Sequence, residues 1–215
     1  MKTKTFLTFL LVNYMFSYCT ANNSNYTILT TEGEIKIKLY EETPLHKANF
    51  EKLVAEKAYD GVLFHRIIED FMIQTGDLST KNDSVQNQVL RDDELIPAEF
   101  VSELFHKKGA IAAARTGDHI NPERKSSPTQ FYIVQGVRQN ENQLKDLEDY
   151  SGKYFTERQK ETYKTIGGTP FLDKDYTVFG EVLEGLDIVD KIAAIPTNGR
   201  DYPLSEVRII TITKD

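Results

Sequence analysis

Short runs of alternating apolar and polar residues, separated by turn signals, recur along most of this 215-residue chain. Alternation of this kind is typical of β-strands, because successive side chains of a strand point to opposite faces of the sheet. The first two runs read as a hairpin over residues 26–40, with its turn at Glu32-Gly33. Further strands are predicted at residues 62–68, 71–74, 110–115, 130–135, 177–182 and 207–213.

Two helices are predicted beside these strands. Thr43 and Pro44 are suited to the N-cap and first position of a helix that ends before the turn at 59–61. A second helix fits residues 186–194, where the apolar side chains share one face. Many short strands with two helices predict a mainly β fold, a closed β-barrel with the helices packed on it.

Residues 136–168 depart from this pattern, because they are charged and read as helical. Thr156 and Gln159 have the spacing of a capping box, and Gly167-Gly168 supplies a stop. We interpret the segment as a helical insertion in one loop of the barrel. Two roles stay open for it: a solvated excursion, or a docking element for a partner at the cell envelope.

The N-terminus has the layout of a secretory signal peptide over residues 1–21. Lys2 and Lys4 precede an apolar stretch at 6–16, and small or polar residues follow from Ser17. The alternative is a short buried N-terminal helix. Export would leave a domain over residues 22–215, located in the periplasm or held to a bacterial membrane as a lipoprotein.

Cys19 is the only cysteine of the chain. Cleavage after Ala21 would remove it. Alternatively, the signal ends before Cys19 and this residue accepts a lipid, although Tyr18 is bulky for the usual lipoprotein box. A lipid on Cys19 would be the only contact with a membrane that the sequence predicts.

The composition argues against several classes of function. The formal charge of −7 speaks against nucleic acid as the main partner, because phosphate binding needs clustered Lys and Arg. No nucleophile elbow, phosphate loop or dinucleotide fingerprint occurs, and the four histidines lack the spacing of metal ligands. We therefore expect no cofactor and no metal, and nothing in the sequence demands more than a monomer.

Residues 64–77, FHRIIEDFMIQTGD, place Arg66 inside an apolar run. An arginine in such a strand is uncommon unless it is paired or used. From the residues alone, two interpretations are open, a buried ion pair and a functional residue.

This stretch resembles the active-site motif of the cyclophilins, which reads FHRxIxxFMxQ followed by Gly-Asp. Residues 109–115, 127–133 and 171–180 resemble further blocks of the same family and occur in the family's order. The resemblance implies an eight-stranded antiparallel barrel capped by two helices, with a proline pocket on its outer face. The resemblance reaches from Tyr26 to the C-terminus, and only residues 136–168 are extra relative to the family.

Carried over position by position, the resemblance implies a set of site residues. Arg66 matches the catalytic arginine, and Gln74 is expected to fix the geometry beside it. Read alone, the apolar residues of the set would belong to a core, Gln130 to a strand and Tyr176 to a sheet surface. The expected wall of the proline pocket is Phe71, Met72, Tyr132, Phe171, Leu172 and Tyr176, its polar groups are Gln74 and Gln130, and Ala114 and Arg115 match positions that contact the peptide backbone.

Three replacements distinguish this chain from the family pattern. Phe171 stands in place of the pocket tryptophan, Tyr176 in place of a histidine and Tyr132 in place of a phenylalanine. All three remain aromatic, so the apolar wall is kept. The indole N–H suited to a ligand carbonyl is lost, which predicts weak inhibition by cyclosporin.

The predicted function is a peptidyl-prolyl cis-trans isomerase that assists the folding of exported proteins. Its partners would be unfolded or flexible polypeptides that contain proline. The alternatives are a non-catalytic module that binds proline peptides and an envelope docking protein. The presence of Arg66 together with Phe71, Met72 and Gln74 favours the enzyme, because a binder needs no donor aimed at the amide nitrogen.

Overall fold

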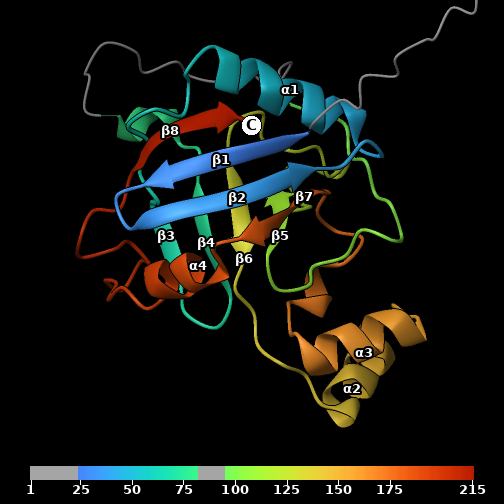
Figure 1. Cartoon of the computed structure of the whole chain (residues 1–215). Helices are drawn as coiled ribbons and strands as arrows, with labels where there is room; N and C mark the ends of the chain where they lie inside the picture. Colours follow the sequence, from blue (N-terminus) through green and yellow to red (C-terminus); the bar gives the residue numbers. More distant parts are fainter. Residues whose placement is uncertain (1–23, 82–94) are drawn as a thin grey trace, which may run out of the picture.

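The computed structural model describes residues 24–81 and 95–215. The predicted signal peptide and Cys19 therefore lie outside the described residues. Within the described ranges there are eight β-strands and four α-helices, joined by turns and two short 3-10 helices (Figure 1). In chain order the elements are β1 (Asn25–Thr30), β2 (Gly33–Leu39), α1 (Pro44–Ala55), β3 (Arg66–Ile68), β4 (Met72–Thr75), η1 (Leu78–Thr80), β5 (Ala110–Ala113), β6 (Phe131–Val134), α2 (Glu141–Ser151), α3 (Glu157–Thr165), η3 (Pro170–Leu172), β7 (Val178–Glu184), α4 (Leu186–Ala193) and β8 (Ile209–Lys214).

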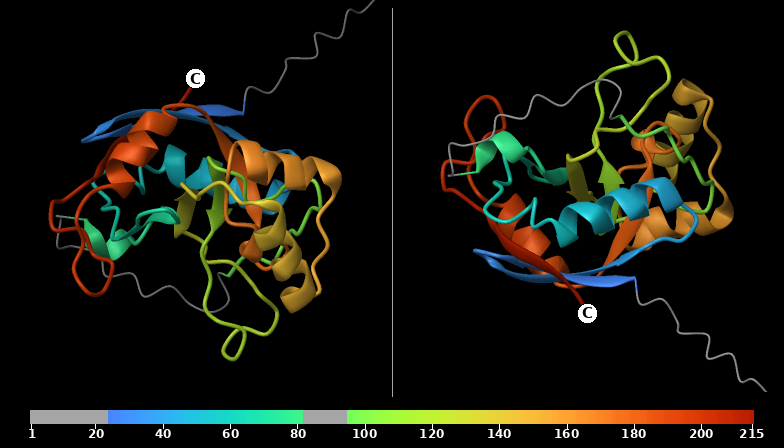
Figure 2. Two further views of the ribbon diagram at one scale, coloured as in Figure 1. Left: turned by 90° about the horizontal axis from the view of Figure 1, so that it is seen from below. Right: turned by 90° about the horizontal axis from the view of Figure 1, so that it is seen from above.

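All eight strands belong to one antiparallel sheet in the order β3-β4-β6-β5-β7-β2-β1-β8, which curls around a core (Figures 1 and 2). The expected closed barrel is corrected to a half-barrel, because within residues 24–81 and 95–215 no strand ladder joins β3 to β8. Backbone hydrogen bonds from residues 62–64, which precede β3, to the start of β8 and the residues before it bridge the gap instead. Phe64 donates a backbone hydrogen bond to Val207, and Ile209 donates one to Val62, both at 2.8 Å.

The core fills the concave side of the sheet. Alternate residues of β5 and β6, such as Ile111 and Ile133, point into it, while their neighbours Ala112 and Tyr132 belong to a second cluster on the opposite face. Phe50 of α1 lies in the core, 5.6 Å from the Phe131 ring and 5.9 Å from the Phe179 ring. α4 contacts β2, β3 and β4. The two predicted helices, α1 and α4, therefore both pack on the sheet.

The start of α1 differs from the prediction. The side chain of Thr43 makes no cap hydrogen bond. The Glu99 carboxylate accepts from the backbone N–H groups of Leu45 at 3.1 Å and His46 at 3.0 Å, so it satisfies two of the unpaired donors of the first turn. α1 also ends at Ala55, earlier than predicted. A carboxylate brought by tertiary structure has replaced the local cap.

Residues 136–168, here called the helical segment, contain α2 and α3, which contact each other. The capping box predicted at Thr156 and Gln159 is present, and a second one, at Asn140 and Gln143, was not predicted. The segment leaves and re-enters the sheet at one point, since Gly168 donates to the Val137 carbonyl at 3.1 Å. That the segment is an insertion relative to the family stays a prediction.

The predicted hairpin is confirmed by β1 and β2, and each of the other predicted strands overlaps an observed one. β3 is the main exception in length, because residues 62–65 lie outside it. In the described ranges, no helix has the length and apolar character needed to cross a bilayer.

Candidate active site

A pocket with a volume of about 230 Å³ lies on the outer face of the sheet, on the side away from the core. It is lined by nine of the eleven residues that the sequence predicted for catalysis or peptide binding. They are Arg66, Phe71, Met72, Gln74, Ala114, Arg115, Tyr132, Leu172 and Tyr176. The two predicted residues outside this lining, Gln130 and Phe171, each contact a residue that belongs to it.

Strand register brings the polar and apolar parts of the pocket together. Arg66 on β3 lies opposite Gln74 on β4, and Gln74 lies opposite Tyr132 on β6. Opposite residues in an antiparallel pair have their side chains on the same face, about 5 Å apart. One row across three strands therefore places a guanidinium, an amide and an aromatic ring side by side.

One nitrogen of the Arg66 guanidinium is hydrogen-bonded within the protein. Its Nε donates to the Asp201 carboxylate at 3.2 Å, and the Asp201 carbonyl accepts from the Ile67 N–H at 2.8 Å. The Arg66 side chain is 43% exposed and that of Asp201 41%, so this ion pair is open to solvent and the alternative of a buried pair is wrong. No acceptor in residues 24–81 or 95–215 bonds the two terminal amino groups of Arg66, which leaves them free for a ligand.

The apolar wall combines buried and exposed rings. Met72 is buried, and Phe71 and Leu172 are partly buried in the outer cluster. Phe171 is 48% exposed, and its ring lies 5.5 Å from that of Phe71. The residue at the tryptophan position thus supports the wall from outside the pocket.

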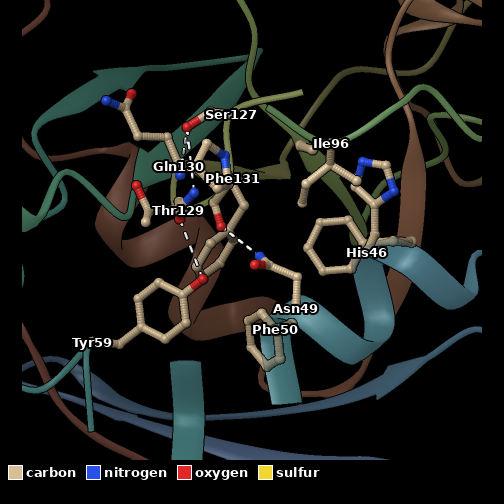
Figure 3. Close-up of a pocket in the computed structure, with 12 residues that line it drawn as sticks. His46, Asn49, Phe50, Tyr59, Ile96, Ser127, Thr129, Gln130 and Phe131 are labelled. Carbon is tan, nitrogen blue, oxygen red and sulfur yellow. Dashed lines mark hydrogen bonds between the residues drawn. The ribbon is translucent and has the colours of Figure 1, made fainter. Parts of the chain in front are cut away.

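Gln74 donates from Nε2 to Oε1 of Gln130 at 3.0 Å. Gln130 lies at the end of the turn at residues 127–130. Side chains from α1 and from the residues after it contact this turn, around a second, very small cavity (Figure 3). Asn49 of α1 donates to the Pro128 carbonyl of the turn at 2.5 Å, and Tyr59 donates to its Thr129 carbonyl at 3.3 Å. These contacts fix the position of Gln130, and through it that of Gln74.

The hydroxyl of Tyr132 is bonded to a residue behind the pocket. It lies 3.0 Å from Nε2 of His106, whose Nδ1 lies 2.8 Å from the Asp173 carboxylate. Burial holds the pKa of Tyr132 well above its ordinary value, and nearby Tyr176 and Asp173 add to the effect. The hydroxyl therefore keeps its proton.

Sequence reasoning missed His106 and Asp173. Asp173 lies inside the block 171–180 that carries the resemblance, but nothing in the pattern indicated a partner 67 residues earlier.

Arg115 makes several contacts within the protein. Its side chain is 5% exposed, and it donates to the Asp175 carbonyl at 2.6 Å and to Asp118 at 2.6 Å. Its guanidinium carbon lies 4.5 Å from the centre of the Tyr176 ring. The guanidinium thus ties together two loops at the edge of the pocket. Its predicted contact with the peptide backbone stays a prediction.

No group of three or more His, Cys, Asp or Glu side chains suited to a metal ion occurs in the described ranges.

The family model described as cyclophilin type peptidyl-prolyl cis-trans isomerase matches residues 26–214. The chain belongs to this family. A protein of Staphylococcus saprophyticus named as a peptidyl-prolyl cis-trans isomerase is 34% identical over 187 residues, which cover 85% of this chain and 87% of that protein. A Streptococcus pyogenes protein named as a bifunctional phosphatase and peptidyl-prolyl cis-trans isomerase is 35% identical over 192 residues, or 86% of this chain and 37% of that protein.

Solved cyclophilin structures share the fold. The crystal structure of a Cryptosporidium parvum cyclophilin type peptidyl-prolyl cis-trans isomerase, determined in the presence of the dipeptide Ala-Pro, superposes with a TM-score of 0.64. It is 20% identical, and the match covers 89% of this chain and 98% of that one. A cyclophilin from Hirschia baltica gives a TM-score of 0.61 at 20% identity, covering 89% and 74% of the two chains. The family membership places this cyclophilin-type chain in the enzyme class of the peptidyl-prolyl cis-trans isomerases.

Proposed function

We propose that this chain accelerates rotation of Xaa-Pro bonds in flexible segments of exported proteins, with Arg66 as the catalytic residue. One observation carries the proposal: Arg66 lines an apolar pocket while its terminal amino groups have no acceptor in the described ranges. The family supports the reaction, and the neighbouring structure obtained with Ala-Pro supports a proline peptide as the ligand.

The reaction needs little chemistry from the protein. Resonance gives the peptide C–N bond partial double-bond character, with a rotation barrier of ~20 kcal/mol. The two isomers of an Xaa-Pro bond differ by only ~0.5–1 kcal/mol, so both occur in unfolded chains. A catalyst must therefore bind the twisted amide more tightly than either planar form.

Arg66 is suited to stabilise the twisted state. When the amide twists, its nitrogen becomes pyramidal and regains a lone pair that can accept a hydrogen bond. The guanidinium is permanently charged and rigid, and Asp201 fixes it through Nε, so its terminal N–H groups remain available. The apolar side chains of the pocket would strengthen this interaction once a bound substrate displaces water from it.

The other pocket residues hold the substrate while it turns. Phe71, Met72 and Leu172 offer an apolar surface for the proline ring. Gln74, fixed by Gln130, lies beside Arg66 and is placed to bind a carbonyl of the peptide. The proline is thereby held on one side of the bond, and the residues before it are free to rotate.

We also propose that the protein works outside the cytoplasm as a monomer, with unfolded or flexible polypeptides as partners. The charge order of the first residues supports export, as does the polar stretch after Ala21. Assistance to the folding of exported proteins follows from that location and from the slow rate of uncatalysed proline isomerisation.

The test is the cis-to-trans conversion of a proline peptide followed with and without the mature protein. The enzyme predicts a faster conversion at catalytic amounts of protein. The alternative of a binding module predicts that the protein binds the peptide without changing the rate of conversion.

A further inference from the structure

The helical segment contacts the loop that carries the pocket wall, residues 170–176, at two places. Tyr163 of α3 donates its hydroxyl to Oδ2 of Asp173 at 2.6 Å. Lys153, in the turn between α2 and α3, donates to Oδ2 of Asp175 at 2.5 Å and to the Phe171 carbonyl at 3.0 Å. Both contacts lie next to Leu172 or Tyr176, which line the pocket.

The first contact continues to the pocket through a chain of buried groups. Oδ1 of Asp173 accepts from the backbone N–H of His106 at 2.9 Å and lies 2.8 Å from its Nδ1. The two nitrogens of the His106 ring therefore face Asp173 on one side and Tyr132 on the other. The Tyr132 hydroxyl lies 3.0 Å from Nε2 of that ring. Tyr163 is thus connected to the Tyr132 ring in the pocket.

The second contact reaches the loop after β5 through Asp175. Asp175 accepts from Lys153 on one oxygen and from Arg124 on the other, at 2.7 Å. Its carbonyl accepts from Arg115, which lies over the Tyr176 ring. A single aspartate therefore links the helical segment with two loops that line the pocket.

The groups of the first connection are buried, so the Asp173 carboxylate needs hydrogen-bond donors from the protein. Tyr163 and His106 are 0% exposed and Asp173 is 4% exposed. A buried carboxylate is costly unless donors surround it, and in the described ranges Oδ2 of Asp173 has the Tyr163 hydroxyl as its donor. Tyr163 is itself fixed by the rings of Phe105 and Phe155, whose centres lie 5.4 and 5.8 Å away. The helical segment supplies a group that this loop needs.

Resting on the proposed function, we propose that Tyr163 and Lys153 are positioning residues that set the shape of the proline pocket. The helical segment would then be part of the substrate-binding apparatus, although none of its residues lines the pocket. Leu172, Tyr132 and Tyr176 line the pocket, and under this proposal they would hold the substrate equally in the planar and the twisted states, so their displacement would weaken binding uniformly. Uniform binding appears in KM and leaves kcat little changed.

The experiment compares two test variants with two matched controls. Tyr163→Phe removes only the hydroxyl, and Lys153→Met removes the charge but keeps the length of the side chain. Tyr150→Phe is the control for the first, since Tyr150 is 93% exposed on α2. Lys164→Met is the control for the second, since Lys164 pairs with Glu141 and Glu161 within the segment. Thermal unfolding followed by circular dichroism checks that each variant is folded at the assay temperature.

Two quantities are measured for each protein: the separate kcat and KM for an Ala-Pro peptide, and the Kd of the same peptide by calorimetry. We expect each test variant to raise KM and Kd by about threefold or more, with kcat unchanged within about twofold. The controls should match wild type. Test variants that are folded and keep the KM and Kd of the controls would overturn the proposal and favour a solvated excursion, as would a fall in kcat without a rise in KM.

The same data separate this proposal from the proposed function. A wild-type protein that binds the peptide without turnover contradicts the enzyme, while the Kd values of the variants still decide the role of Tyr163 and Lys153. A wild-type protein that neither binds nor turns over the peptide contradicts both.

Discussion

Tyr132 shows how one residue can be apolar toward a ligand and polar toward the protein. Its ring lines the pocket, while its hydroxyl is hydrogen-bonded to His106, a residue outside the pocket lining. The extra oxygen relative to phenylalanine is thus satisfied inside the fold. This explains physically how the replacement of a pocket phenylalanine by tyrosine leaves the wall apolar.

Phe171 leads to a prediction about inhibition. It stands where the family has a tryptophan, lies outside the pocket lining and offers no N–H to a ligand carbonyl. We expect cyclosporin to inhibit isomerisation only weakly, and Phe171→Trp to strengthen the inhibition. The measurement is the inhibitor concentration that halves the rate of each protein. Inhibition of the wild type at nanomolar concentrations would show that the indole is not needed.

The residues of the pocket could be predicted because the family motif contains them, whereas the strand pattern alone would have assigned the apolar ones to a core. What could not be predicted are contacts made across large sequence separations. Asp201 holds Arg66 over 135 residues, and His106 holds Tyr132 over 26. The sequence indicated that Arg66 would be paired or used, and the structure shows an exposed pair that leaves room for use.

At the scale of elements, the two ends of the helical segment lie against each other, at Gly136 and Gly168. A Cβ added to Gly136, whose φ is +58°, would lie 2.5 Å from the Cα of Gly168. Only glycine allows the two backbones to pass so closely. The sheet strands on either side, β6 and β7, are both paired with β5 and not with the segment. The sheet therefore does not depend on α2 and α3 for its pairing.

This geometry predicts that the segment can be removed. Replacing residues 138–166 by a short glycine turn should leave a protein that unfolds cooperatively, with a lower melting temperature, because the buried contacts of Phe105 are lost. Its affinity for an Ala-Pro peptide should fall, since Asp173 and Asp175 lose their donors from the segment. Circular dichroism and calorimetry measure the two effects. A truncated protein with no cooperative transition would contradict the independence of the sheet.

The predicted elements were those with a strong local pattern. The hairpin, α4 and the Thr156 capping box depend on neighbouring residues, and all are present. The start of α1 was wrong in detail, because its cap comes from Glu99, more than fifty residues later in the chain. The closed barrel was also wrong, since closure depends on the whole path of the sheet, which no single strand pattern fixes.

At the scale of the whole molecule, the family domain accounts for residues 26–214, and the residues before it include the predicted signal peptide. The proposed export and the proposed proline pocket would together describe a protein that meets polypeptides while they are still flexible. Neither the location nor those substrates follow from the fold, because the same fold can serve different compartments.

Export predicts a processed N-terminus. The mature protein should begin either at Asn22, after cleavage following Ala21, or at a lipid-modified Cys19. Intact mass spectrometry of protein purified from the native host distinguishes the two forms, and Cys19→Ser should release the protein from membranes only in the second case. A mature protein that retains Lys2 would contradict export.

The central claim is that Arg66 in this pocket accelerates Xaa-Pro rotation, and one measurement tests it most directly. The rate of cis-to-trans conversion of an Ala-Pro peptide is measured in a protease-coupled assay with wild type, Arg66→Ala and Arg138→Ala. Arg138, an exposed arginine of the helical segment outside the pocket lining, is the matched control. We expect catalysis by wild type and the control, and a loss of about tenfold or more in kcat/KM for Arg66→Ala, equal to ~1.4 kcal/mol of transition-state stabilisation. An unchanged rate in Arg66→Ala would contradict the role of this residue, and no catalysis by wild type would contradict the function itself.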